Sequence, residues 1–393
     1  MAVKTVEDFK ASVEEVYQLI ENQTPFTFVD VRDFTLFQQN DYSEGDGYDL
    51  LHLPYTDFQN NLPEALAKLP PGKLVLICRS GRKTKLVMDL IKDEPRDMMW
   101  VEGGLRAWRS FFVTGTVLEN QSGAIYQITR PGRGDLSYAV VSDGEAILID
   151  PMRNTEVYLD LLAEKGAELI AIFDSHNHAD RISGGRFLAE ETGAPYYKHP
   201  YDAIHLVDRL PMQVPYQFLK DGDIFTIGQF QLRVIWFPGH TLGMTNFLLT
   251  TPAKDRFLFS GDGIFIQSIG RPDLMGKGEP WAEILYESLH TRLEQFVTPD
   301  TLVLPAHFTL FRERNSDGLY AATYAHLQQT NPMLRPMQEQ EFIQYVLQDV
   351  PVAPDEYLEI LRINHALMEV DDERATELEA GKNLCSATIE VPK

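Results

Sequence analysis

Short apolar runs alternate with amphipathic stretches from Val6 to Arg109. Lys73–Ile77 is apolar and partly β-branched, as expected for a buried strand, and Lys85–Lys92 has the spacing of a helix. Alternation of this kind is typical of a sheet flanked by helices. We therefore predict an α/β domain over residues 1–115.

The pattern changes after this region. Val113–Gly123 is polar and contains two glycines, which predicts a connection between domains. Strand-like runs then follow at Ile125–Arg130, Tyr138–Val141 and Ala146–Asp150. Thr155–Gly166 has the pattern of an amphipathic helix. These elements predict a second domain, of mixed α and β structure, over residues 116–312.

The last part of the chain has a mostly helical pattern. Pro332, Pro351 and Pro354 interrupt it. We predict a helical C-terminal extension over residues 313–393, in which the acidic stretch Glu369–Lys382 is exposed.

Composition narrows the class of protein. The chain has 393 residues, 44% of them hydrophobic, which is enough for two separate cores. A net charge of −23 argues against a nucleic-acid partner. Without a long apolar span or a signal-like start, we expect a cytoplasmic protein that does not bind membranes. We also expect a homo-oligomer. Two cysteines in separate regions suggest reactive thiols instead of a disulfide framework.

Histidines and aspartates follow several strand-like runs. They are His176, His178 and Asp180 after Leu169–Phe173, His240 after Leu232–Phe237, Asp262 after Arg256–Leu258, and His307 after Thr301–Val303. Imidazole nitrogens and carboxylate oxygens at strand ends can converge on one ion. A single H-x-H pair is commonly two surface histidines, but the joint order of these motifs predicts a metal site.

This order resembles the metallo-β-lactamase superfamily, which implies an αββα sandwich with the metal at one edge of two packed sheets. The resemblance is closer to the persulfide dioxygenases, because Leu148-Ile149-Asp150-Pro151 and Gly270-Arg271-Pro272-Asp273-Leu274 also match. Asn383-Leu384-Cys385 is similar to a C-terminal motif of that family. The match extends over residues 120–310 and, loosely, over the C-terminal part.

The resemblance implies one Fe(II) per chain, held by His176, His240 and Asp262, with zinc as the alternative. His178 lies beside these ligands and either tunes or joins the site. The implied substrate is a low-molecular-weight persulfide, typically glutathione persulfide, oxidised to sulfite with O2.

Two further segments could reach the substrate. Arg271 and Asp273 lie in a loop and are expected to brace the pocket mouth, with Arg271 available to a substrate carboxylate; a weak surface ion pair is the alternative. Cys385 either folds back toward the metal pocket, as the family motif suggests, or is an exposed terminal thiol.

Arg181 departs from the superfamily pattern. The usual H-x-H-x-D-H motif ends in a histidine that helps to bind a second metal, and Arg181 replaces it. A guanidinium stays protonated and offers no lone pair to a metal. Asp180, Asp262 and His307 remain at the second position, so we expect a mononuclear site. Alternatively, Arg181 points outward and leaves a weak second site.

A second chemical signature is Cys78-Arg79-Ser80-Gly81-Arg82-Lys83-Thr84, between a predicted strand and a predicted helix. Backbone N–H groups at a helix start favour the cysteine thiolate, and so do the cations Arg79, Arg82 and Lys83. We predict that Cys78 is a nucleophile and that the three cations stabilise an anionic donor and a persulfide. The alternative is an inert, buried cysteine.

Residues 8–112 resemble a rhodanese (sulfurtransferase) domain. The matching pieces are Asp30-Val31-Arg32, Leu51-His52-Leu53-Pro54, the Cys78 loop, and Glu102-Gly103-Gly104 with Trp108. Leu51, Tyr55 and Thr56 stand where that family has small residues, and Asp41–Asp49 is an acidic insertion. The resemblance implies thiosulfate or a thiol as sulfur donor or acceptor.

Together these motifs predict a persulfide dioxygenase fused to a sulfurtransferase. There are two alternatives, of which the first would use the same metal-site motifs. One is a zinc-dependent thioester hydrolase of the glyoxalase II kind. The other is a non-catalytic rhodanese-like binding module.

Overall fold

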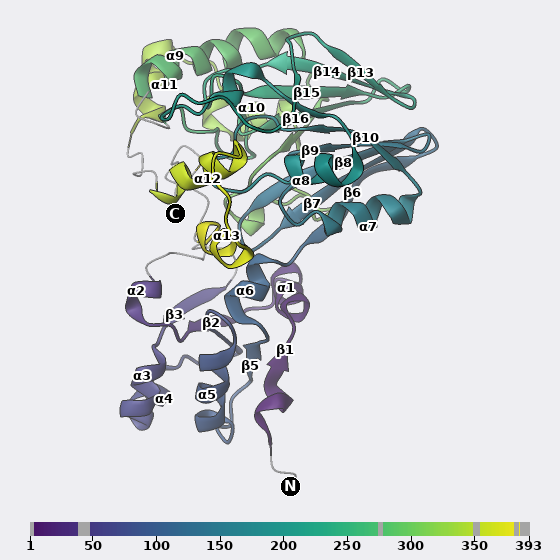
Figure 1. The fold of residues 1–393 in the computed structure, drawn as a ribbon. Helices are drawn as coiled ribbons and strands as arrows, with labels where there is room; N and C mark the ends of the chain where they lie inside the picture. Colours follow the sequence, from purple (N-terminus) through teal and green to yellow (C-terminus); the bar gives the residue numbers. More distant parts are fainter. Residues whose placement is uncertain (1–3, 38–47, 274–277, 349–353, 381–384, 386–393) are drawn as a thin grey trace.

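The first part of the chain forms a parallel sheet with helices on both sides. The computed structural model describes residues 4–37, 48–273, 278–348, 354–380 and 385 (Figure 1). The strand order is β1-β5-β4-β2-β3, with β1 (Lys10–Ala11), β2 (Thr27–Asp30), β3 (Asp49–His52), β4 (Leu74–Ile77) and β5 (Met98–Val101). The helices are η1 (Val6–Phe9), α1 (Val13–Glu21), α2 (Phe34–Phe37), α3 (Tyr55–Asn60), α4 (Leu62–Lys68), α5 (Arg82–Ile91) and α6 (Gly104–Arg109).

Strand β4 is buried on both of its faces. Leu74 and Leu76 belong to a core that α5 covers, whereas Val75 and Ile77 face the core shared with the second half of the chain. Two-sided burial explains why this strand is continuously apolar instead of alternating. Cys78 directly follows β4 and therefore lies at the carboxyl edge of the sheet.

The Cys78 loop is held against the start of α6. Gly104 has a φ of 60°, and a Cβ on it would lie 2.1 Å from the carbonyl oxygen of Cys78. The peptide nitrogen of Leu105 donates a hydrogen bond of 2.9 Å to that oxygen. Glycine is therefore required where the two backbones approach each other.

Two larger sheets pack face to face in the second part of the chain (Figure 1). The first has the order β12-β11-β10-β9-β8-β7-β6, with β6 (Val113–Asn120), β7 (Gly123–Arg130), β8 (Asp135–Ser142), β9 (Glu145–Ile149), β10 (Glu168–Phe173), β11 (Tyr196–Lys198) and β12 (Gln217–Phe218). The second runs from β13 to β18 in sequence order, with β13 (Ile224–Ile227), β14 (Phe230–Trp236), β15 (Thr245–Thr250), β16 (Arg256–Gly261), β17 (Leu302–Pro305) and β18 (Ala322–Thr323).

Aromatic side chains fill the space between these sheets. Tyr138 and Phe259 meet edge to face with ring centroids 5.0 Å apart, and Phe173 lies 5.4 Å from Phe247. The outer faces are covered by α7 (Glu156–Lys165) and α8 (Gly185–Thr192) on one side, and by α9 (Gly278–Glu287), α10 (Tyr324–Thr330) and α11 (Glu339–Val346) on the other. The expected αββα sandwich is confirmed.

Single-turn and irregular helices complete this part of the chain. They are η2 (Pro200–Ala203), η4 (Ser288–Arg292, a π-helix), η5 (Leu293–Gln295), η6 (Phe311–Glu313) and η7 (Pro332–Leu334).

The prediction of a polar connection over Val113–Gly123 is wrong. Val113–Asn120 is strand β6, which pairs antiparallel with β7 and forms the edge of the seven-stranded sheet. An edge strand is half solvated, so its polar residues do not prevent strand formation. The acidic insertion Asp41–Asp49 lies outside the described residues except for Tyr48 and Asp49.

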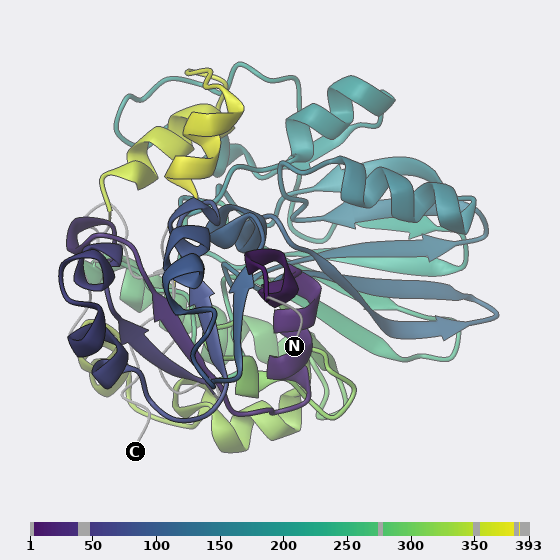
Figure 2. The same ribbon diagram turned by 90° about the horizontal axis from the view of Figure 1, so that it is seen from below.

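Helix α12 (Glu356–Asn364) packs on the second part of the chain, where Arg362 pairs with Asp208. Helix α13 (Asp372–Leu378) reaches the first part, where Glu373 pairs with Arg106. Figures 1 and 2 show α13 beside the carboxyl edge of the N-terminal sheet. The expectation that Glu369–Lys382 is exposed throughout is wrong, because Leu378 and Glu379 are buried. Pro351 lies outside the described residues. No helix in the described part of the chain has the length and apolarity that crossing a bilayer requires.

Candidate metal centre

The loop after β10 carries the first two histidines into the interior. Its backbone is fixed by Asp150, whose Oδ1 accepts a hydrogen bond of 2.7 Å from the peptide nitrogen of Ser175. The carbonyl oxygen of Ser175 in turn accepts from the peptide nitrogen of Thr245 in β15. The loop therefore bridges the two sheets at their common edge.

His176, His240 and Asp262 converge at this edge. Nε2 of His176 lies 3.6 Å from Oδ2 of Asp262, and Nε2 of His240 lies 3.4 Å from the same oxygen. All three side chains are buried. The three ligand atoms lie within 4.8 Å of one another, as a shared metal ion requires.

Hydrogen bonds turn both imidazole rings toward that point. Nδ1 of His240 lies 2.8 Å from the carbonyl oxygen of Arg271, and Nδ1 of His176 lies 2.9 Å from Oγ of Ser175. Burial holds the pKa of His176 well below its usual range, and the neighbouring imidazoles act in the same direction. Burial also lowers the pKa of His240. Neutral rings with Nε2 facing inward are the form that binds a metal.

The donor set fits a metal ion. Within the described part of the chain, Nε2 of His176 and Oδ2 of Asp262 are buried without a hydrogen-bond partner. Buried polar atoms are rarely left unsatisfied in a native structure. Two histidines and one carboxylate that leave other coordination positions open form the facial set typical of non-haem iron, although zinc accepts the same atoms.

A model of the metallo-beta-lactamase superfamily matches residues 130–307. The probable metallo-hydrolase YqgX of Bacillus subtilis is 31% identical over 185 residues, which are 44% of this chain and 83% of that protein. This chain belongs to the metallo-β-lactamase superfamily. The match contains all of the clustered histidines and aspartates described above.

Two further relatives add detail. The persulfide dioxygenase ETHE1 of Bos taurus is 30% identical over 192 residues, which are 48% of this chain and 66% of that protein. The crystal structure of a metallo-beta-lactamase from Staphylococcus aureus superposes with a TM-score of 0.54 at 26% identity, over 63% of this chain and 73% of that one. The chain thus spans slightly less than two thirds of the bovine persulfide dioxygenase.

His178, the other histidine of the superfamily loop, faces a different group. Its Nε2 lies 3.1 Å from Oδ1 of Asp150, and with Asp150 and Asp174 it forms a separate buried cluster. Its ring nevertheless packs 4.1 Å from that of His176. In this structure His178 supports the first ligand and does not share the His240–Asp262 cluster.

His307 and Asp180 form a third buried cluster, together with Asp135. Nδ1 of His307 lies 2.6 Å from Oδ1 of Asp262, and Nε2 lies 3.0 Å from Oδ2 of Asp180. Burial lowers the pKa of His307, but the carboxylates of Asp262 and Asp180 outweigh it and raise that pKa well above its usual range. The second metal position expected from the superfamily pattern therefore holds the imidazole of His307 between the carboxylates of Asp262 and Asp180.

Arg181 points into this region, not outward. Its side chain is 0% exposed, and its Nη1 donates a hydrogen bond of 3.0 Å to the carbonyl oxygen of Leu136. Burial alone would lower the pKa of Arg181, but Asp135 and Asp150 contribute most to a net rise. The guanidinium thus supplies a fixed positive charge among the carboxylates of the superfamily's second metal position.

Arg271, Asp273 and Cys385 lie next to the ligand set. The guanidinium of Arg271 is buried and pairs with both carboxylate oxygens of Asp273 at 2.7 Å. The peptide nitrogen of Arg271 donates to the carbonyl oxygen of Cys385. Cys385 is buried against Ala179 and Tyr357, and this burial, followed by the charge of Asp180, raises the pKa of its thiol. Leu274, Asn383 and Leu384 of the matching motifs lie outside the described residues.

The second candidate nucleophile, Cys78, is 2% exposed, and its Sγ lies 3.6 Å from Oγ1 of Thr84. Two of the three cations in its loop are paired: Arg79 with Glu377 at 2.6 Å, and Lys83 with Asp33 at 2.7 Å. The third, Arg82, is exposed at the start of α5.

Several charged residues around these sites had no role predicted from the sequence. Asp135 pairs with Arg130 and lies 3.3 Å from Nε2 of His307. Glu379 accepts hydrogen bonds from Arg130 at 2.9 Å and from the peptide nitrogen of Ile182 at 2.8 Å. Arg130 ends β7 and Asp135 begins β8, so the two flank the turn between these strands. A charge pair this close in the sequence could have been predicted. The pairing of Glu379 could not, because its partners are far away in the sequence.

Proposed function

We propose that this protein oxidises a low-molecular-weight persulfide of the glutathione type to sulfite with O2, using one iron per chain, and that Cys78 transfers sulfane sulfur. The observation that carries the proposal is the buried guanidinium of Arg181. A cation cannot coordinate a metal, and it opposes a second metal by Coulomb repulsion. Relatives named persulfide dioxygenase support the substrate class.

His176, His240 and Asp262 are the residues that would hold the iron. When bound there, ferrous iron supplies the redox chemistry with O2 and leaves positions open to the persulfide. Overall, one persulfide, one O2 and one water give one thiol, sulfite and two protons. Ser175 and the carbonyl of Arg271 orient the two imidazoles. The burial of all three ligands excludes bulk water from the reacting groups.

In the first part of the chain, the proposed chemistry is thiol-based. The Cys78 thiolate attacks the sulfane sulfur of thiosulfate, an Sγ–S bond forms, and sulfite leaves with the electrons of the broken S–S bond. A second thiolate then attacks the outer sulfur of the Cys78 persulfide, which releases a small persulfide and restores the Cys78 thiolate. This product belongs to the substrate class of the metal centre.

The zinc-dependent hydrolase is a second candidate because of one observation. Asp135, Asp180 and His307 could themselves hold a metal ion, and the Bacillus subtilis relative is named a probable metallo-hydrolase. Two metal ions would activate a water for attack on a thioester. The charges of Arg130 and Arg181 next to Asp135 oppose this arrangement.

Metal analysis and oxygen uptake separate the two candidates. We expect about one iron per chain in the purified protein, oxygen consumption with glutathione persulfide, and negligible hydrolysis of S-lactoylglutathione. His240→Ala should abolish oxygen uptake. Two tightly bound zinc ions per chain, or thioester hydrolysis faster than oxygen uptake, would overturn the proposal. A protein with neither activity would instead be the non-catalytic, rhodanese-like binding module.

A further inference from the structure

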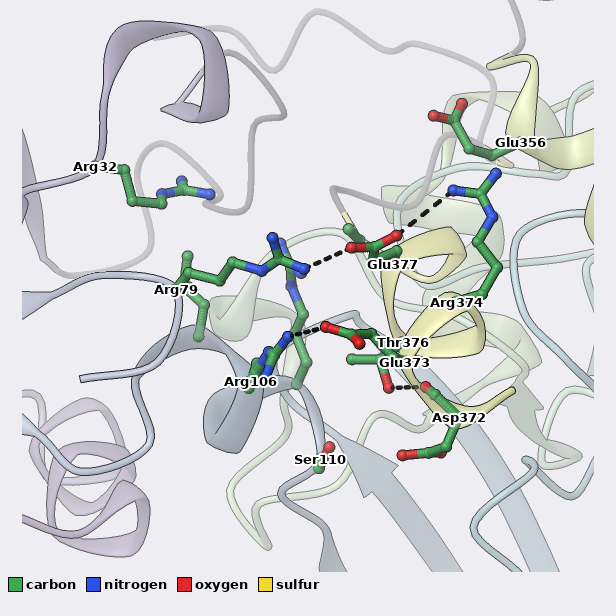
Figure 3. Close-up of a pocket in the computed structure, with 13 residues that line it drawn as sticks. Arg32, Arg79, Arg106, Ser110, Glu356, Asp372, Glu373, Arg374, Thr376 and Glu377 are labelled. Carbon is green, nitrogen blue, oxygen red and sulfur yellow. Dashed lines mark hydrogen bonds and ion pairs between the residues drawn. The ribbon is translucent and has the colours of Figure 1, made fainter. Parts of the chain in front are cut away.

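A cavity of about 540 Å³ lies between the N-terminal sheet and α13 (Figure 3). One wall is cationic: Arg32 follows β2, Arg79 follows Cys78, and Arg106 and Arg109 belong to α6. These residues stand at the carboxyl edge of a parallel sheet, where open α/β folds bind their ligands. The cavity therefore begins at the Cys78 loop.

The opposite wall is anionic. Glu373 and Glu377 of α13 face the arginines across the cavity, and Asp372 and Glu356 lie beside them (Figure 3). Arg106 pairs with Glu373 at 2.9 Å, and Arg79 pairs with Glu377 at 2.6 Å. Arg374 of α13 also lines the cavity, but it pairs with Glu359 at 2.5 Å and with Glu377 at 3.7 Å on its own side (Figure 3). The α13 wall therefore keeps an excess of carboxylates, and the facing wall is cationic.

The anionic wall is fixed in place. Arg153, which lies next to the metal loop, contacts α13 through Asp372 at 2.5 Å and Thr376 at 2.8 Å, and it contacts Glu379 at 3.0 Å. Glu379 is 3% exposed and also binds Arg130. The helix is therefore held to the second part of the chain, and it presents Glu373 and Glu377 to the cavity.

The two ion pairs across the cavity are weak enough to exchange partners. The side chains of Arg79 and Arg106 are each 45% exposed, and those of Glu377 and Glu373 are 41% and 70% exposed. Solvated pairs of this kind contribute little, so a ligand that carries both signs of charge can replace them. A simple anion would be attracted by one wall and repelled by the other.

We propose that this cavity binds a small zwitterionic thiol, with carboxylate and ammonium groups, that accepts sulfane sulfur from Cys78. The carboxylates of the ligand face the arginine wall, and its ammonium faces Glu373 and Glu377. The size of the cavity is within the range of small-molecule sites. The acceptor role rests on the proposed sulfur transfer at Cys78, whereas the binding site itself does not.

Calorimetric titration with S-methylglutathione, which has no free thiol, tests the binding. Arg106→Gln should weaken binding about fivefold to tenfold, because it removes a charged donor to the ligand carboxylate. Glu373→Gln should weaken it as well, because the ammonium loses its partner. Lys73→Gln is the matched control: Lys73 pairs with Asp97 at the opposite edge of the same sheet and should leave binding unchanged.

The two walls make the outcomes distinct. If Glu373→Gln tightens binding while Arg106→Gln weakens it, the site is for simple anions and the zwitterion proposal fails. If neither variant differs from the control, the cavity is not the site. 3-(Methylthio)propionate, which lacks an ammonium group, should bind at least about fivefold more weakly than S-methylglutathione.

His240→Ala separates this proposal from the metal-centre chemistry. The variant should lose oxygen uptake and keep the binding that depends on Arg106. If the binding disappears in His240→Ala, the ligand sits at the metal centre and the cavity proposal is overturned. If the binding persists but wild-type protein lacks oxygen uptake, the proposed function fails and the cavity site stands.

Discussion

Nδ1 of His240 lies 2.8 Å from the carbonyl oxygen of Arg271, so the ligand ring is oriented by a backbone group ten residues beyond the last ligand strand. The peptide nitrogen of Arg271 in turn donates a hydrogen bond to the carbonyl oxygen of Cys385. Groups that orient a metal-bound histidine typically change metal affinity by one or two orders of magnitude. A substitution in the loop before Arg271 is therefore a sensitive test of how the metal ligands are oriented.

Gly270→Ala should lower the affinity for the metal by about tenfold to a hundredfold. A Cβ at this position would lie 2.0 Å from the carbonyl oxygen of Asp262 and 2.8 Å from Nδ1 of His240, so the backbone has to shift away from both ligands. Metal content after dialysis against graded chelator measures the effect. Gly278→Ala is the control, since its nearest neighbour would be Leu347 at 3.6 Å. Equal metal retention in both variants contradicts the orienting role of this loop.

Arg181→His should raise the metal content from about one to about two ions per chain when zinc is supplied. The substitution removes the buried cation and restores a ligand beside Asp180 and His307. Without metal, the variant should be less stable by about 3–5 kcal/mol, because buried carboxylates lose their counter-charge. Elemental analysis and thermal unfolding with and without zinc measure both effects. A stoichiometry that stays at one shows that Arg181 does not determine nuclearity.

Glu379→Gln should destabilise the protein at neutral pH by about 2–4 kcal/mol. Burial raises the pKa of Glu379, but Arg130 and Arg153 outweigh it and hold the pKa below its usual 4.5. A lowered pKa in the folded state means that the carboxylate stabilises the fold above about pH 4.5 and that this contribution is lost as the pH falls further.

Denaturant unfolding at pH 7 and at pH 3.5 therefore distinguishes wild type from Glu379→Gln. The difference between their free energies of unfolding should be largest at pH 7 and smaller at pH 3.5. A difference that does not change with pH would mean that the charge of Glu379 is not what stabilises the fold. Glu341→Gln, an exposed change in the first turn of α11, serves as the control.

Cys78→Ser should abolish sulfur transfer from thiosulfate to a thiol, because the hydroxyl does not form a persulfide. Oxygen uptake on preformed glutathione persulfide should remain within about twofold of wild type, since the metal centre uses none of the Cys78 loop. Cyanolysis of the persulfide and an oxygen electrode report on the two reactions separately. Sulfur transfer by the serine variant would rule out Cys78 as the acceptor.

Local sequence patterns predicted the elements that position the metal loop. The apolar run at Leu169–Phe173 is the end of β10, and the helix expected at Thr155–Gly166 is α7. Both signals are local: hydrophobic period, and a glycine at the end of a helix. The edge strand β6 was missed because the polarity of its solvated side resembles that of a loop.

The charged network behind the metal loop was not predictable in the same way. The hydrogen bond from Arg130 to Glu379 spans 249 residues, and nothing around Glu379 distinguishes it from the exposed acids beside it. The burial of Glu379 depends on how α13 packs against residues far away in the sequence. Similarly, the sequence placed His178 beside the ligands, but only the three-dimensional structure shows that it turns toward Asp150.

The anchoring of Ile182 by Glu379 has a consequence for biosynthesis. The peptide nitrogen of Ile182 and its acceptor are separated by 197 residues. Because a nascent chain leaves the ribosome from its N-terminus, the histidine loop emerges long before the residue that fixes it. The N-terminal sheet can fold while translation continues, whereas the metal loop reaches its final geometry only after α13 has been made. Metal insertion is therefore expected only after α13 and Glu379 have left the ribosome.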